Sequence, residues 1–129
     1  MTERQCKQLL REDILPVILG NSISAHRLSL SIHAKYGLCS LLCAPRSRFL
    51  DLINPFAFFL PLMTDTHPRL IREQLSDLSM RYENTLLLLI PSTQEELSRL
   101  GKETDALEEN FLLVRSPDRL KTILAPCLR

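Results

Sequence analysis

The sequence lacks the long apolar segments and the charge runs that mark several classes of protein. Its longest apolar stretches, such as residues 85–91, are far shorter than the roughly 20 residues that a membrane-spanning helix needs. The N-terminus has no apolar core of a secretory signal. Sixteen Lys and Arg stand against fifteen Asp and Glu, with no basic run suited to a phosphate backbone. These absences predict a cytoplasmic protein with no membrane and no nucleic-acid partner.

Cysteine pairs and glycine-rich turns are also missing. The four cysteines have no CxxC spacing, and Cys39 and Cys43 fall in an apolar run where they are expected to pack as small hydrophobes. The chain has three glycines, and the turn after the first apolar run contains only Gly20. The GxGxxG fingerprint of dinucleotide-binding proteins is therefore absent. We expect neither a metal site nor nicotinamide chemistry.

Five short apolar runs are present and indicate strands. With 129 residues, 45% of them hydrophobic, the chain has the size and composition of one globular domain. The runs cover residues 14–19, 38–43, 56–63, 86–90 and 111–114. Their nearly continuous apolar character is typical of strands buried on both faces, as in a parallel sheet covered by helices.

Segments with helical period lie between these runs. One has apolar residues at positions 25, 28, 32 and 36 and ends at Gly37, and another begins near Pro68. Ser92 or Thr93 offers a capping box, residues 105–109 suggest a short helix, and Ser116 with Pro117 marks a final helix start. Residues 45–55 show no long helix. This order predicts a Rossmann-like three-layer α/β/α domain over residues 13–129, with a mainly parallel sheet of about five strands and an N-terminal extension at 1–12.

A ligand site is expected where the strand order reverses, outside the carboxyl ends of the strands. For the order 3-2-1-4-5, that crevice lies between the first and fourth strands. The candidate binding residues come from the loops after the first, second and fourth strands: Gly20, Asn21, Ser22, Ser24, Arg46, Ser47, Ser92 and Thr93. Helix capping by Asn21 and Ser22, and backbone geometry at Gly20, are the structural alternatives.

The histidines and acidic residues give no catalytic pattern. His26 is expected to face solvent, His33 to pack on a helix flank, and His67 to lie in a turn. No Ser-His-Asp or Cys-His arrangement follows from their spacing. The acidic cluster at residues 103, 105, 108 and 109 is expected to form a solvated face, and we expect no catalytic residue in this chain.

Several motifs in order resemble one known family. Residues 16–20, 24–25 and 31–41 resemble the pre-ATP-grasp domain of bacterial ATP-grasp carboxylate-amine ligases, such as D-aspartate ligases and carbamoyl-phosphate-synthase-like proteins. Residues 87–91 resemble the fourth strand of that domain, and residues 107–111 with 116–117 resemble the segment that leads to the ATP-grasp domain. The resemblance covers about residues 13–125. This chain differs at Arg27, where relatives often have a glycine, and at residues 92–94, where they often have Gly-Asp.

The resemblance implies a reaction in which ATP and Mg²⁺ convert a carboxylate to an acyl phosphate, which an amine then attacks. The catalytic groups would belong to an ATP-grasp domain beginning after about Pro126, so the chain would need no cofactor and would not be catalytic alone. Its partners would be that domain and a small carboxylate or amine substrate. The alternative functions are a non-catalytic interaction or regulatory module, with a homodimer formed through an exposed apolar surface, and an autonomous domain of flavodoxin or receiver type. A receiver would need an acidic pair where this chain has Leu19 and Gly20.

Overall fold

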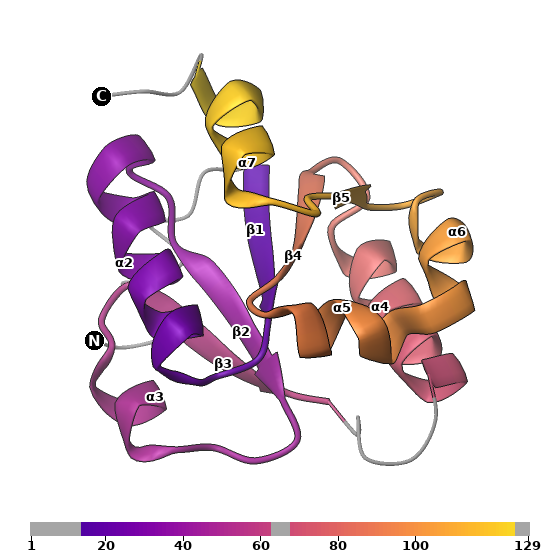
Figure 1. Ribbon diagram of the computed structural model, residues 1–129, viewed down its shortest axis with the longest axis horizontal. Helices are drawn as coiled ribbons and strands as arrows, with labels where there is room; N and C mark the ends of the chain where they lie inside the picture. The colour runs from indigo at the N-terminus through magenta and orange to yellow at the C-terminus, as the bar shows by residue number, and fades with distance from the viewer. Residues whose placement is uncertain (1–13, 63–67, 126–129) are drawn as a thin grey trace.

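The structure, a computed structural model, describes residues 14–62 and 68–125 (Figure 1). Its strands are β1 (Ile14–Leu19), β2 (Ser40–Ala44), β3 (Ala57–Pro61), β4 (Leu86–Pro91) and β5 (Leu112–Leu113). Its helices are α2 (Ile23–Tyr36), α3 (Phe49–Ile53), α4 (Pro68–Arg81), α5 (Gln94–Leu100), α6 (Thr104–Leu107) and α7 (Pro117–Leu124), with a 3-10 turn at Gly101–Glu103. The predicted extension 1–12, the turn at His67 and the expected domain boundary near Pro126 lie outside the described residues.

The five strands form one parallel sheet in the order β3-β2-β1-β4-β5. In the centre of the sheet, Val17 of β1 is in register with Leu41 of β2 on one side and Leu89 of β4 on the other. Five of the six β1 residues are buried, as expected for a strand with a neighbour on each edge and helices on each face. The sequence-based prediction of a mainly parallel, five-stranded sheet is confirmed.

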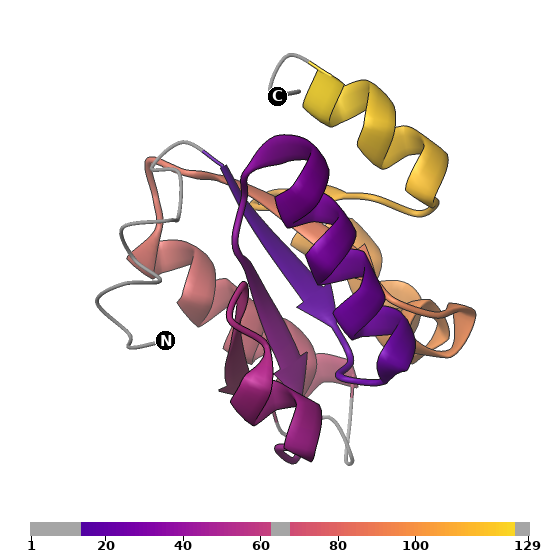
Figure 2. The same cartoon turned by 90° about the vertical axis from the view of Figure 1, so that its left-hand side faces the viewer.

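Alternate residues of each strand point to opposite faces and build two cores. On one face, Leu15, Val17 and Leu19 join buried residues of α4, α5 and α6. On the other face, Ile18 and Leu42 pack with buried residues of α2 and α7. Figure 2 shows α2 and α7 together on their side of the sheet, with α4 behind it. The result is a three-layer α/β/α domain of Rossmann-like type.

Local signals fix the ends of several helices. Gly37 has φ of 73° and donates its N–H to the carbonyl of His33 at 2.9 Å, which ends α2 where the sequence predicts. At the start of α5, Thr93 Oγ1 accepts a hydrogen bond from the N–H of Glu96, so the second of the two predicted capping positions is used. The second strand begins at Ser40, two residues later than expected, because pairing with β3 begins at Ser40 and Ala57.

The connection from β2 to β3 contains only the five-residue helix α3, consistent with the absence of a long helical pattern there. Its apolar residues are all exposed, and Figures 1 and 2 show it at the periphery of the domain, below α2. No helix within 14–62 and 68–125 is both long and apolar enough to cross a membrane.

Candidate functional site

The carboxyl ends of the neighbouring strands β1 and β4 lie side by side, at the point where the strand order reverses. Ser92 follows β4 and donates both its N–H and its hydroxyl to the carbonyl of Leu19, at 3.1 and 2.7 Å. Gly20, with φ of 107°, lies so close that a Cβ added there would be 2.6 Å from Ser92 Oγ. Because Gly20 has no Cβ, the Ser92 side chain can approach its backbone closely. The two predicted site loops touch each other directly.

Two hollows lie on either side of this contact. The larger, about 530 Å³, is enclosed by the first turns of α2, the start of α5 and the β5–α7 connection. The smaller, about 350 Å³, lies between the β1 and β2 loops and α5, and its lining includes Gly20, Asn21, Arg46 and Arg99. A volume of several hundred Å³ is in the range of sites that hold small molecules.

The larger hollow has the chemistry of an anion site. Arg27 of α2 and Arg115, which follows β5, contribute guanidinium groups, and no Asp or Glu belongs to its lining. Hydroxyl groups come from Ser24, Ser92, Thr93 and Ser116, and the apolar lining comes from Leu28, Ile90, Leu97, Val114 and Leu120. The first turn of α2 and the N-cap of α7 also border the hollow, which adds partial positive charge. A small carboxylate with an apolar portion fits this lining.

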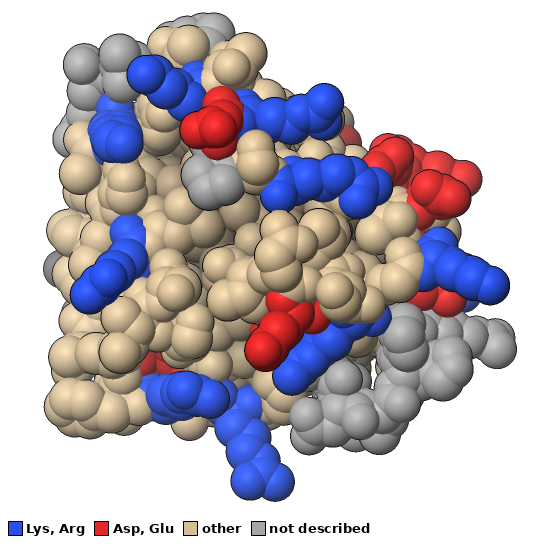
Figure 3. Space-filling view, in the orientation of Figure 1, with Lys and Arg blue, Asp and Glu red and all other residues tan. Residues whose placement is uncertain are grey.

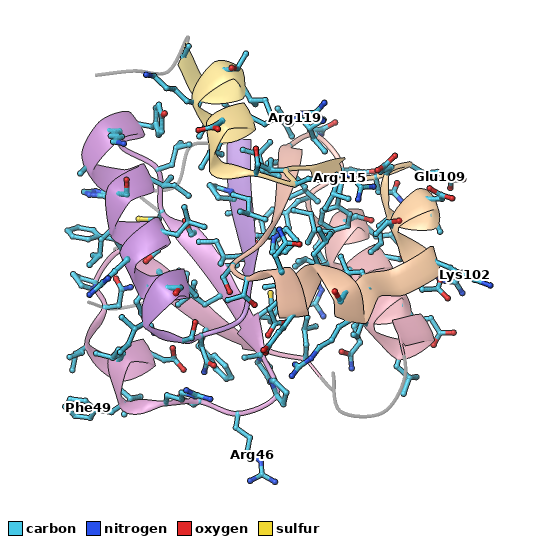
Figure 4. All side chains as sticks on the ribbon, viewed as in Figure 1. Arg46, Phe49, Lys102, Glu109, Arg115 and Arg119 are labelled. Carbon is cyan, nitrogen blue, oxygen red and sulfur yellow. The ribbon has the colours of Figure 1, made fainter. Side chains whose placement is uncertain are left out.

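Basic side chains surround the rim of the larger hollow near α7. Figure 4 shows Arg115 and Arg119 projecting on the same side of the β5–α7 segment, and Figure 3 shows basic side chains gathered around α7 on this face. Arg115 Nη2 contacts Glu108 Oε1 at 3.2 Å, and both side chains are about half exposed. Such an exposed ion pair is weak, so Arg115 can exchange Glu108 for a bound anion at little cost.

A network of buried polar groups lies on the other flank of α2. The side chains of Asp51 and His26 are 1% and 6% exposed, and His26 Nε2 is 2.8 Å from Asp51 Oδ1. Asp51 Oδ2 accepts hydrogen bonds from Asn21 Nδ2 at 2.8 Å and from the N–H of Arg48 at 2.7 Å. The expectation that His26 faces solvent is wrong, because α3 folds against α2 and places Asp51 over the imidazole.

The hydrogen bonds of Asn54 fix the tautomer of His26. Asn54 Oδ1 accepts from the N–H of Phe56 at 3.0 Å, so its amide nitrogen faces Ser29 Oγ and His26 Nδ1, each at 2.9 Å. His26 Nδ1 is therefore an acceptor, and the proton on Nε2 is donated to Asp51. Both ring nitrogens are occupied within the fold. A catalytic Asp-His pair leaves one nitrogen free for the reacting group, so this pair is structural.

The predicted site residues divide into separate groups. Ser24, Ser92 and Thr93 line the larger hollow, whereas Gly20, Asn21 and Arg46 line the smaller one. Ser22 Oγ is buried with no hydrogen-bond partner, and Ser47 is exposed and lines neither hollow.

The structure also shows whether Asn21 and Ser22 cap α2 through their side chains. Asn21 is not a cap, because its amide donates to Asp51 and to the carbonyl of Arg46 at 2.7 Å. Ser22 occupies the N-cap position of α2 without a capping hydrogen bond from its side chain.

Sequence reasoning did not include Arg115 and Ser116 among the candidates. Arg115 directly follows the fifth apolar run, so the rule that ligands bind at the carboxyl ends of strands would have selected it if applied to that strand. Arg27, noted above only as a difference from the pre-ATP-grasp pattern, supplies a charge to the larger hollow.

Metal-binding and reactive cysteine chemistry receive no structural support in the described part of the chain. No group of three or more His, Cys, Asp or Glu within 14–62 and 68–125 could hold a metal ion. Cys39 and Cys43 are buried, as predicted. Burial raises the pKa of the Cys43 thiol from 9.0 to about 12, which keeps it protonated and unreactive near neutral pH.

Comparison of the chain with protein-family models, with curated proteins and with solved structures gives no match.

Proposed function

We propose that this domain binds a small carboxylate in the larger hollow and acts as the substrate-side domain of an ATP-dependent carboxylate-amine ligase. The observation that carries this proposal is the pair Arg27 and Arg115 in a hollow whose lining has hydroxyl groups and no acid. A planar guanidinium group can hold a carboxylate through two parallel hydrogen bonds, which fixes its orientation as well as its charge. The resemblance of residues 13–125 to pre-ATP-grasp domains supplies the reaction class.

The role of the domain in that reaction would be positioning. Holding a carboxylate with its reacting oxygen toward a catalytic domain lowers the entropic cost of the transfer. ATP, Mg²⁺ and the bond-making groups would be supplied by an ATP-grasp partner. This function places the chain in the cytoplasm, where ATP is available.

A titration of the isotope-labelled protein with small carboxylates, followed by NMR chemical shifts, tests the binding step. Aspartate, glutamate, succinate and acetate form a suitable panel. We expect at least one to shift amide signals of Ser24, Thr93 and Ser116, and Arg27→Gln or Arg115→Gln to weaken that binding by about tenfold. Lys102→Gln is the matched control, because Lys102 is exposed in the 3-10 turn after α5 and does not line the hollow.

A titration with Mg-ATP separates the ligase proposal from its main competitor. The substrate-side domain should not bind Mg-ATP by itself, since the nucleotide site would belong to the partner domain. Binding of Mg-ATP to this chain would instead identify an autonomous nucleotide-binding domain. Binding of no carboxylate in the panel, with native spectra, would contradict the substrate-binding role.

A non-catalytic interaction module is the second candidate function, and the surface of α3 favours it. Phe49, Leu52 and Ile53 are 72%, 78% and 57% exposed, which is unusual for three large apolar side chains on five consecutive residues. The two functions are compatible, because this surface and the larger hollow lie on opposite flanks of α2.

A further inference from the structure

The short helix α3 exposes an apolar ridge. Phe49, Leu52 and Ile53 carry most of its surface, and Ile23 and Leu30 of α2 add side chains that are 62% and 44% exposed. Helical period places Ile23 and Leu30 on the stripe of α2 that includes His26, which contacts α3 through Asp51. Ile23 and Leu30 therefore lie on the side of α2 that faces α3. Contiguous apolar surface of this kind marks an interaction site.

The ridge is held in place by hydrogen bonds although the apolar residues of α3 are all exposed. Asp51 anchors the helix to His26, to Asn21 and to the N–H of Arg48, and Asn54 anchors its C-terminal end to Ser29. The polar residues of α3 and its end thus point inward, while the apolar residues point outward. A surface helix in contact only with water normally has its polar residues outward and its apolar residues toward the core.

Two basic side chains, Arg46 and Arg48, lie next to the ridge in the sequence, and the one acid of α3 is buried. Both arginines precede α3 and are exposed. Between residues 14 and 62 the only acid is Asp51, whose carboxylate is buried in the network. Residues 68–125 carry the opposite balance, with ten Asp and Glu against eight Lys and Arg. This charge balance makes the α3 side of the domain suited to an anionic surface.

The shape and the charge decide between possible occupants. A second copy of this chain would bring the arginines of two equivalent ridges together, and this like-charge repulsion opposes symmetric association. Phe49, Leu52 and Ile53 are each more than half exposed, so the ridge presents side chains outward. Figure 4 shows Phe49 and Arg46 both projecting away from the body of the domain. A fluid lipid surface accommodates such a projection without a preformed groove.

We propose that α3 docks the protein on an anionic lipid surface, with Phe49, Leu52 and Ile53 entering the boundary between headgroups and acyl chains. Arg46 and Arg48 would contact the lipid phosphates, where each basic residue near the surface changes binding by about fivefold. A few apolar side chains with two or three arginines give reversible attachment and no membrane-spanning segment. The sequence-based expectation of no membrane partner rested on the absence of such a segment.

Co-sedimentation with lipid vesicles tests the proposal, using the whole chain. Vesicles of phosphatidylcholine alone are compared with vesicles that also contain phosphatidylglycerol. We expect binding to the anionic vesicles only, reduced about tenfold or more by Phe49→Ser with Leu52→Ser and to a similar extent by Arg46→Gln with Arg48→Gln. High salt should release the protein.

Matched controls use residues of equal exposure elsewhere. Met80→Ser replaces an apolar side chain that is 75% exposed on α4, and Lys102→Gln removes an exposed positive charge. Both should bind vesicles as the unchanged protein does. All variants change exposed side chains, and their thermal unfolding should match that of the parent chain.

Three results would overturn the proposal. The first is no binding to anionic vesicles by the folded protein, which would assign the ridge to a protein partner. The second is equal binding to both vesicle types with no effect of the arginine changes. The third is a dimer in solution, by light scattering, that Phe49→Ser with Leu52→Ser dissociates, which would assign the ridge to self-association.

Discussion

Replacing Gly20 by alanine should destabilise the domain by about 2.5 kcal/mol, through backbone strain and loss of the contact that joins the two site loops. At φ of 107° an alanine is strained by about 2 kcal/mol. Its Cβ would also lie 2.6 Å from Ser92 Oγ. The serine must then give up its hydrogen bond to the carbonyl of Leu19, which costs about 1 kcal/mol. Lower entropy of the unfolded alanine chain offsets about 0.5 kcal/mol.

Urea unfolding followed by circular dichroism measures this loss, and a second background isolates the contact. Ser92→Ala alone should cost about 1 kcal/mol. In that background Gly20→Ala should cost only about 1.5 kcal/mol, because the hydrogen bond has already been removed. Gly101→Ala is the matched control, since Gly101 also has positive φ but has no atom within 4 Å of an added Cβ.

An equal cost of Gly20→Ala in both backgrounds would refute the reasoning, because the Ser92 contact would then contribute nothing. A cost below about 1 kcal/mol in the parent chain would show that the loop relaxes without strain.

Two further predictions concern buried groups. Asp51→Ala should destabilise the domain by about 3 kcal/mol in the same assay, because it leaves His26, Asn21 and the N–H of Arg48 without their acceptor. Asp77→Ala is the control: Asp77 is exposed, so its replacement should change the free energy of unfolding by no more than about 0.5 kcal/mol. A loss below about 1 kcal/mol for Asp51→Ala would show that the network is not needed for stability. For Cys43, whose pKa is raised from 9.0 to about 12, the folded state holds the proton more tightly, so unfolding free energy should fall as pH rises from 9 to 12. The fall should be shallower in Cys43→Ala, and identical pH profiles would contradict this assignment.

Features of the site that depend on neighbouring residues could be predicted from the sequence. Features that depend on contacts between residues far apart in the chain could not. Gly20, Ser92 and Thr93 could be proposed from the sequence because each directly follows a strand or caps a helix, and such signals involve neighbouring residues. The division of the loops into two hollows was not found, because it depends on the contact of Ser92 with Leu19, 73 residues apart. The position of Arg115 in the lining of the larger hollow also depends on a long-range contact, because α7 packs beside α2 in one core.

The sequence by itself determined the strands, the main helices and the parallel sheet, because apolar period, glycine and capping residues act within a few positions of the chain. Continuous apolar runs require burial on both faces, and helical crossovers between them require parallel strands. Only the tertiary structure decided the environment of His26. Its partner Asp51 is 25 residues away on a helix too short to show a period, and no local pattern indicates which side of α3 turns inward. The same packing decided that Phe49 and Leu52 remain at the surface.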